Sequence, residues 1–375
     1  MKTQFPRRRC ARAASRVVLR CVCVTLTLVL SGCPAERDDR SNPSAQPAYR
    51  APQATQAVLL DGTRGGDTIV VVGERGIALA SRDGGQHWDQ GQVPLRFTLT
   101  AVFMYDAQLG WAVGADATVL RTTDGGRSWS VQNTAPEEGT LLLDVWFADP
   151  SRGFAVGAYG TFLVTSDGGQ TWTSRDFVAP PVRIGGPSSV VQADAAREAD
   201  DTEGADIWED IEGPLAFHLN RIAVASDGTL YIAAEAGHIF RSDDSGENWT
   251  VLPSPYEGSF FALLALEGDA VFAVGFEGHI FRSEDRGNSW TEIPSGTAAT
   301  LTRSARLADG TVVVAGPDGT LLSSSDDARS FTLHGSADLI GTYALLGVDG
   351  DYLLVIGKDG VRRMAISEAL GDAVQ

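Results

Sequence analysis

The chain has 375 residues, of which 43% are apolar and 21% charged, a composition typical of a globular protein. Its formal net charge of −18 argues against nucleic acid as a partner, because phosphate binding needs clustered lysine and arginine. All four cysteines lie within the first 33 residues, so a cysteine-based zinc site and an internal disulfide are excluded for everything after Cys33.

Residues 1–32 predict a secretory signal, because a basic stretch precedes an apolar run over 17–30. The segment holds seven basic residues and no acidic one. The run is shorter than the roughly 20 residues of a membrane span. Residues 30–33, Leu-Ser-Gly-Cys, resemble a bacterial lipobox, which implies cleavage before Cys33 and lipid attachment to its thiol. The alternative is an ordinary signal with an incidental cysteine.

Residues 33–55 are rich in proline, serine, alanine and charge, so they predict a flexible tether behind the lipid. Pro34 follows the cysteine, and by analogy with lipoproteins this favours the outer membrane. We therefore expect an exported lipoprotein on the periplasmic face of the outer membrane or at the cell surface. Residues 33–375 contain 23 basic and 48 acidic residues, which gives a net charge of −25.

A repeat organises residues 56–367. Six copies of an Asp-Gly segment occur, typified by TTDGGRSW at 122–129, and their aspartates are spaced by 41, 43, 77, 41 and 41 residues. Two apolar stretches with a turn between them precede each copy, and a seventh pair, LVIGKDGVRRM, has no Asp-Gly segment. Seven units with a period of about 41 residues indicate a repeat architecture.

Each unit predicts four short antiparallel strands, in the second unit near 99–105, 111–114, 118–122 and 129–132. Four strands per period is one propeller blade, so the fold class is all-β, a seven-bladed β-propeller. The last unit has only three strands before the tail at 368–375. Residues 49–55 are expected to supply its fourth strand and thereby close the ring.

The Asp-Gly segments resemble the Asp-box of sialidases and many other β-propellers. In this turn the aspartate accepts backbone N–H groups, a glycine takes φ > 0 and the tryptophan packs around the turn. A calcium site is the alternative, but the alternating carboxylates of a calcium loop are missing, so no metal or cofactor is expected. The structural residues are Asp83, Asp124, Asp167, Asp244, Asp285, Asp326, Trp88, Trp129, Trp172, Trp249 and Trp290.

One insert, residues 178–214, departs from the period between the third and fourth units and carries nine acidic residues in its second half. Loops of this length are usually functional or disordered. Its candidate docking element for a protein partner is Asp200, Asp201, Trp208, Glu209 and Asp210. A solvated acidic loop is the alternative.

Seven such units behind a lipobox resemble the photosystem II assembly and stability factor family of β-propellers with BNR/Asp-box repeats. The resemblance implies a non-catalytic, membrane-anchored, monomeric scaffold that binds a protein partner during assembly of a membrane complex. It also implies partner contact through arginines, and Arg121, Arg241 and Arg282 share one repeat position. Pairing of these arginines with nearby acids of the blade is the alternative.

An enzyme is the competing class, because sialidases share the Asp-box. A catalytic group should occur once and not recur in every blade, and most candidates here recur; His238 and His279, for example, occupy the same repeat position. No GxSxG, P-loop or HExxH motif is present, so no catalytic residue is predicted. A periplasmic or surface glycan-binding module and a sialidase-like glycoside hydrolase remain the alternatives.

Overall fold

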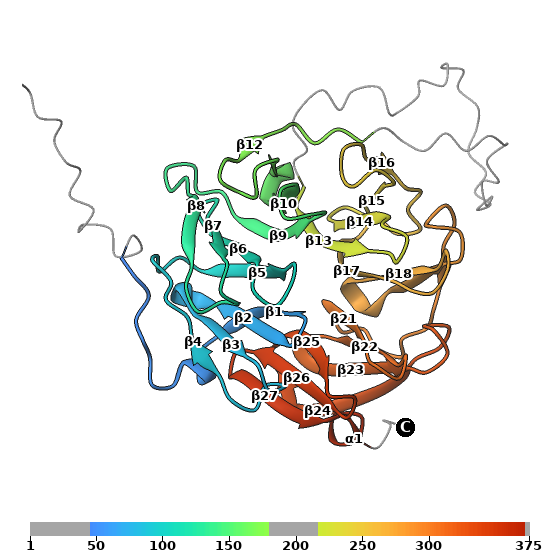
Figure 1. The fold of residues 1–375 in the computed structure, drawn as a ribbon. Helices are drawn as coiled ribbons and strands as arrows, with labels where there is room; N and C mark the ends of the chain where they lie inside the picture. Colours follow the sequence, from blue (N-terminus) through green and yellow to red (C-terminus); the bar gives the residue numbers. More distant parts are fainter. Residues whose placement is uncertain (1–45, 180–216, 372–375) are drawn as a thin grey trace, which may run out of the picture. The chain divides into compact units, whose positions relative to one another are not determined.

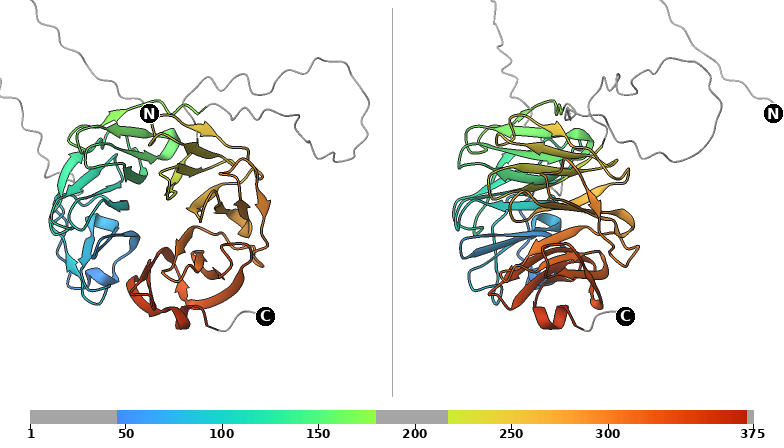
Figure 2. Two further views of the ribbon diagram at one scale, coloured as in Figure 1. Left: turned by 45° about the vertical axis from the view of Figure 1, so that its right-hand side comes forward. Right: turned by 90° about the vertical axis from the view of Figure 1, so that its right-hand side faces the viewer.

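In this computed structural model, residues 46–179 and 217–371 are described, and all of them belong to one compact unit. Their strands form seven antiparallel sheets arranged as a ring, with the first strand of each sheet innermost (Figure 1). The predicted seven-bladed β-propeller is therefore confirmed. Figure 2 shows the blades following one another around the ring in sequence order. Within the described ranges, no helix is both long and apolar enough to cross a bilayer.

The first three blades are built from four strands each. Blade 1 has β1 (Leu59–Gly65), β2 (Thr68–Gly73), β3 (Ala78–Ser81) and β4 (Asp89–Gln90); blade 2 has β5 (Leu99–Met104), β6 (Gly110–Gly114), β7 (Val119–Thr122) and β8 (Ser130–Asn133); blade 3 has β9 (Leu142–Phe147), β10 (Gly153–Gly157), β11 (Phe162–Thr165) and β12 (Thr173–Ser174). The four strands predicted for the second unit all agree with β5 to β8 within one residue at each end.

The remaining blades follow the insert. Blade 4 has β13 (Leu219–Val224), β14 (Leu230–Ala234), β15 (Ile239–Ser242) and β16 (Thr250–Val251); blade 5 has β17 (Phe260–Ala265), β18 (Val271–Gly275), β19 (Ile280–Ser283) and β20 (Thr291–Glu292); blade 6 has β21 (Arg303–Arg306), β22 (Val312–Ala315), β23 (Asp318–Ser324) and β24 (Thr332–Ile340). Blade 7 has three strands, β25 (Thr342–Val348), β26 (Tyr352–Gly357) and β27 (Gly360–Ala365), and a one-turn helix α1 (Ile366–Ala369) follows.

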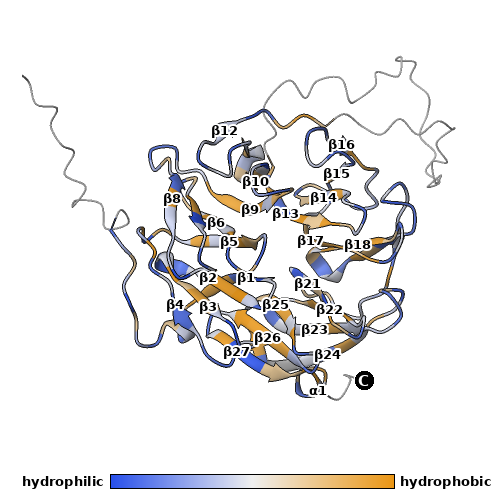
Figure 3. Ribbon diagram, in the orientation of Figure 1, coloured by the Kyte–Doolittle hydropathy of each residue, from blue (hydrophilic) through white to orange (hydrophobic). Residues whose placement is uncertain are grey.

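Each second strand is apolar on both faces because it is covered by a blade on either side. In β2, Val70 and Val72 pack toward Val102 and Ala112 of blade 2, whereas Val71 belongs to a core shared with blade 7. Alternate residues of one strand thus enter two different cores, as the period of two of a β-strand requires. Hydrophobic residues accordingly concentrate in the strands, and the turns are hydrophilic (Figure 3).

The ring has two faces because successive antiparallel strands end on opposite sides. We call the side with the turns between third and fourth strands, such as residues 82–88, the Asp-box face. We call the opposite side, with the turns between second and third strands and the links between blades, the connection face. The described residues of the insert, Val178 and Ala179, lie in the link from β12 to β13 and so belong to the connection face.

The predicted fourth strand of blade 7 is wrong. Residues 54–56 form the 3-10 turn η3 (Ala54–Gln56), which contacts β27 without pairing with it. Pro52 has no N–H to donate to a strand ladder. Instead, the Gln90 side chain bonds to this segment, accepting from Ala51 N at 2.9 Å and donating to Tyr49 O at 2.7 Å. The end of the expected tether therefore lies on blades 1 and 7.

The contact between η3 and blade 7 is tested by replacing Gly360 with alanine. A Cβ at Gly360 would lie 1.8 Å from Thr55 O, so the 3-10 turn would have to move. Gly350→Ala is the matched control, since its φ of 74° is also positive but nothing lies within 4 Å of its Cβ. We expect Gly350→Ala to lower the free energy of unfolding by about 1 kcal/mol and Gly360→Ala by about 1–3 kcal/mol more, measured by urea denaturation. Equal losses would contradict the packing of η3 on blade 7.

Candidate functional site

The six Asp-box turns share one hydrogen-bond pattern. In blade 2, Asp124 Oδ1 accepts the backbone N–H of Ser128 at 2.9 Å and Oδ2 accepts its hydroxyl at 2.6 Å. Thr122 Oγ1 donates to Asp124 Oδ1 and accepts from Gly126 N, both at 2.9 Å. Trp129 Nε1 donates to Gly126 O at 3.2 Å, a bond that recurs in blades 1, 3 and 4 but not in blade 5, where Trp290 Nε1 is buried without a partner among the described residues. The aspartate therefore holds its own turn together, and even the degenerate copy at Asp326 forms the same carboxylate bonds.

These bonds favour the ionised carboxylates. The hydroxyl of Thr171, followed by its backbone N–H, lowers the pKa of Asp167 to about 2. Ser330 and Ser324 lower the pKa of Asp326 in the same way, against the opposing effect of partial burial. The Asp-box carboxylates are thus structural acceptors whose charge is retained well below neutral pH.

The predicted partner-binding arginines lie on the third strands, next to the Asp-box face. Two of them reach the Asp-box turn of the following blade: Arg241 Nη1 donates to Arg286 O at 3.0 Å, and Arg282 Nε donates to Asp327 O at 2.9 Å. Arg121 instead lies over the ring of Trp111 in its own blade, and its Nε is buried with no hydrogen-bond partner among the described residues. Arg363 of blade 7 occupies the same repeat position and donates to Gly84 O at 3.1 Å, across the junction between the last and first blades. Arg241, Arg282 and Arg363 therefore join neighbouring blades.

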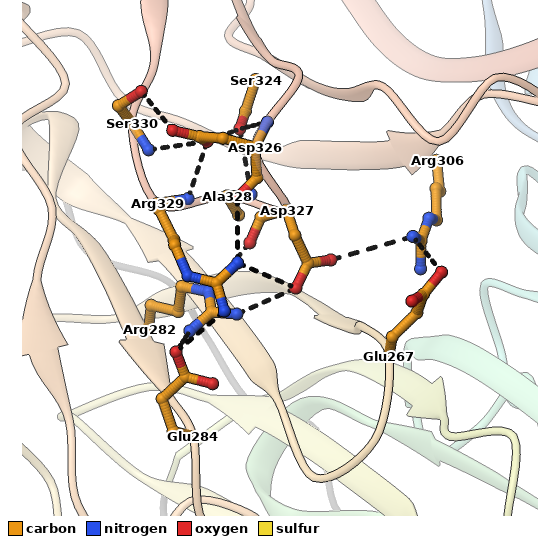
Figure 4. Close-up of polar contacts among 10 residues, drawn as sticks. All are labelled: Glu267, Arg282, Glu284, Arg306, Ser324, Asp326, Asp327, Ala328, Arg329 and Ser330. Carbon is orange, nitrogen blue, oxygen red and sulfur yellow. Dashed lines mark hydrogen bonds and ion pairs between the residues drawn. The ribbon is translucent and has the colours of Figure 1, made fainter.

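Arg282 is the most buried of the three, with 4% of its side chain exposed. Its guanidinium contacts Glu284 and Asp327, and the same two acids bind the more exposed Arg329 (Figure 4). Arg306 joins this network through Asp327 Oδ1 at 3.8 Å and also pairs with Glu267 at 3.0 Å. The guanidinium of Arg282 is thus occupied within the propeller. Partner contact by Arg121, Arg241 and Arg282 stays a prediction. For Arg241 and Arg282 the described ion pairs favour the alternative of pairing within the ring.

A second charged group lies at the centre of the ring. Arg221 of β13 donates from Nη2 to Asp61 Oδ1 of β1 at 2.9 Å, and its Nε lies 3.4 Å from Asp144 Oδ2 of β9. Asp61 also accepts the backbone N–H of Val102 at 3.0 Å. One arginine therefore connects blades 1, 3 and 4. With Arg303 of β21, these residues form what we call the axial charge cluster: Asp61, Asp144, Arg221 and Arg303.

The four members of the cluster occupy one repeat position. Asp61 pairs with Val72, Asp144 with Val156, Arg221 with Ala233 and Arg303 with Ala315. The partner is the residue next to the end of the second strand in the first three cases and the last residue of β22 in the fourth. The other three blades carry alanine there, at Ala101, Ala262 and Ala344. The position lies near the connection face. Because alanine suffices in three blades, the charges serve something other than the fold of a single blade.

Burial controls the ionisation of the cluster. It raises the pKa of Asp144, and the positive charge of Arg221 counteracts this rise. Burial also lowers the pKa of Arg303, to about 10, and the nearby charge of Arg221 adds to this effect. Both arginines are therefore charged at neutral pH. The cluster was missed in the sequence, although four of the seven units carry a charged residue at this position and the other three carry alanine.

The remaining predicted residues lie outside the described residues. They are the lipid-attachment residue Cys33 and the docking element Asp200, Asp201, Trp208, Glu209 and Asp210. In the described part of the protein, no group of three or more His, Cys, Asp or Glu side chains lies together in a way that could hold a metal ion.

The axial charge cluster leads to a paired prediction. Arg221→Met leaves two buried carboxylates without their cation, so we expect it to lower the free energy of unfolding by about 3–5 kcal/mol. Arg303 forms no ion pair among the described residues, so Arg303→Met should change stability by less than about 1 kcal/mol or increase it. Urea denaturation of both variants distinguishes them. A loss for Arg303→Met as large as that for Arg221→Met would contradict the assigned pairing.

The Asp-box turns predict a pH dependence. A folded pKa of about 2 for Asp167 lies below the unfolded value of about 3.9, so its contribution to stability is complete above about pH 4 and is lost as the pH falls toward 2. Asp167→Asn should therefore lose less stability than the unmodified protein between pH 4 and pH 2, measured by thermal unfolding. Asp359→Asn is the control, since Asp359 is 68% exposed and outside any Asp-box. Parallel pH profiles for Asp167→Asn and the unmodified protein would refute the role of this carboxylate.

Comparison with known proteins identifies both repeat and fold. The family model described as photosynthesis system II assembly factor YCF48 matches residues 55–136 and 132–182. No curated protein matches the chain significantly in sequence.

Among solved structures, YCF48 bound to D1 peptide is 18% identical, with a TM-score of 0.60, and the match covers 87% of this chain and 97% of that one. YCF48 from Cyanidioschyzon merolae is 17% identical, with a TM-score of 0.58 and coverages of 83% and 96%. Virginiamycin B lyase from Staphylococcus aureus reaches a TM-score of 0.60 at 13% identity, with coverages of 86% and 98%, so the same fold also supports an enzyme.

At these identities the solved structures show the fold, whereas the repeat is identified by the family model. The resemblance seen in the sequence is thereby confirmed: the chain is a seven-bladed β-propeller whose first three blades carry the repeat of the photosynthesis system II assembly factor YCF48 family.

Proposed function

We propose that the protein is a non-catalytic, membrane-anchored scaffold that binds a protein partner during the assembly or stabilisation of a membrane protein complex. The observation that carries this proposal is the YCF48 repeat over residues 55–182, on a fold shared with a YCF48 bound to a D1 peptide. A peptide ligand on that propeller supports a protein partner for this one.

The chemistry of the described side chains supports recognition. Arg241 and Arg282 bind the Asp-box turn of the following blade, and the Asp-box aspartates bind groups within their own turns. The axial charge cluster combines two carboxylates with two guanidinium groups, which suits binding of a charged group more than nucleophilic attack. A rigid ring with a charged centre is a reasonable platform for a partner.

The membrane anchor rests on the sequence before the propeller. The lipobox at residues 30–33 supports acylation of Cys33, and Pro34 supports delivery to the outer membrane. Because residues 46–56 already lie on blades 1 and 7, the free length of the proposed tether shortens to about a dozen residues. The propeller would then work close to the membrane surface.

A glycan-binding module is the second candidate, and two exposed aromatic residues favour it. Tyr159 is 72% exposed and Phe276 is 43% exposed, and both lie in turns between second and third strands, on the connection face. Aromatic faces of this kind stack on sugars as well as on peptides. The two candidates are separated by what the protein captures.

The anchor is tested by Cys33→Ser. We expect the unmodified protein in the membrane fraction after cell lysis, and the variant in the soluble fraction of the exported material, since only the lipid holds it to the bilayer. Western blotting of both fractions gives the result. A variant that remains fully membrane-bound after a high-salt wash would remove the lipid anchor from the proposal.

The partner is tested by chemical crosslinking in native membranes, followed by mass spectrometry of the captured molecules. We expect subunits of one membrane complex, in amounts that exceed those captured by the Cys33→Ser variant. Recovery of glycan without any specific protein would refute the scaffold and support the glycan-binding module.

A further inference from the structure

Arg303 is a guanidinium that forms no ion pair with any described residue of the propeller. Its Nη1 donates to the carbonyl of the adjacent Thr302 at 2.8 Å, and its Nε is buried with no hydrogen-bond partner. Among the described residues, no carboxylate lies within ion-pair distance of it. The two carboxylates of the axial charge cluster are bound instead to Arg221. A buried donor of this kind lacks its acceptor.

The electrostatic surroundings of Arg303 favour an anion. The strongest single charge acting on Arg303 is the cation Arg221, ahead of the attraction from Asp61 and Asp144. Two guanidinium groups thus lie near each other, and both carboxylates are paired with Arg221. An additional carboxylate would give each guanidinium a pairing of its own.

The blade itself does not require an arginine at this position. Ala101, Ala262 and Ala344 stand at the same place and are almost completely buried, and their blades have the same strand pairing. An uncompensated buried charge opposes folding. A residue that the fold does not need and that burial penalises is best explained by a ligand.

Apolar residues recur one position before the cluster position, toward the connection face. In most blades a β-bulge leaves the residue before the cluster position unpaired, and in four blades this residue is a half-buried apolar or aromatic one: Leu60, Leu143, Phe261 and Tyr343. Phe261 also contacts the exposed Phe276, with ring centroids 4.7 Å apart. The first strands therefore carry apolar residues next to the charged position, which would suit a ligand with apolar groups beside its charge.

We propose that the axial charge cluster is a binding site for a peptide carboxylate, with Arg303 as the residue that pairs with it and Arg221 as the second cation. The carboxylate belongs to the free C-terminus of a polypeptide or to an aspartate or glutamate side group, flanked by apolar residues that contact the ring of Leu60, Leu143, Phe261 and Tyr343. This inference rests on the proposed function for its choice of a peptide, whereas the carboxylate itself follows from Arg303 alone.

The test uses three N-acetylated peptides and the full-length protein in mild detergent, with binding measured by isothermal titration calorimetry. The first is Ala-Leu-Ser-Ala-Leu with a free C-terminus, the second is its C-terminal amide, and the third is the amide with aspartate in place of serine. We expect the first or the third to bind at least about tenfold more tightly than the second, because only a peptide with a carboxylate can form a charge-assisted pair with Arg303. The arm that binds identifies the source of the carboxylate.

Three variants link binding to the site. Arg303→Met should weaken binding of the acidic peptide to the level of the neutral amide, and Arg303→Lys, which keeps the charge without the bidentate fork, should lie between Met and the unmodified protein. Arg152→Met is the matched control, because Arg152 is 62% exposed, pairs with Asp149 and lies on the opposite face. Circular dichroism of each variant establishes that it is folded before binding is compared.

Equal affinity for the acidic and neutral peptides, absence of binding by all three, or undiminished binding by folded Arg303→Met would overturn the proposal. Arg303-dependent binding of oligogalacturonate but of no peptide would also overturn it, and would assign the site to an acidic glycan. A positive peptide result with no protein partner recovered from membranes would reject the proposed function while leaving the axial site intact.

Discussion

The packing of each second strand between two neighbouring blades is the constraint on which the rest of this structure depends. A strand such as β2, buried along its whole length, has apolar side chains on both faces, so no blade can bury its own core alone. The protein satisfies this requirement only when β26 of blade 7 reaches β2 of blade 1 and supplies the last core. Closure is therefore a condition for burial in every blade.

Charged residues reinforce the same arrangement on the Asp-box face. The aspartate of each Asp-box orders a turn locally, and the arginines at one repeat position attach that turn to the preceding blade. At the junction of blades 7 and 1, Arg363 makes this contact over the largest separation in sequence, and its guanidinium also stacks on Tyr352 at 3.3 Å. Polar and apolar contacts thus repeat with one period around the ring.

The axial charge cluster departs from that period. Its position in the blade is the same each time, yet it holds two acids, two arginines and three alanines. A group that breaks the repeat cannot be explained by the needs of the repeat. The centre of the ring therefore carries the features of a recognition site, and the arginines of the third strands do not. Arg221 is paired within the cluster, whereas Arg303 is available to a ligand.

The sequence by itself determined the strands, the number of blades and the Asp-box turns, because these depend on local periodicity and on contacts within about eight residues, as between Asp124 and Ser128. Only the tertiary structure decided which charges meet. Asp61 and Arg221 are 160 residues apart and become partners because ring closure brings their strands to one centre, and η3 replaced the expected strand because Gln90 of a neighbouring blade bonds to that segment. Contacts of this range depend on how whole blades are placed, which local patterns do not encode.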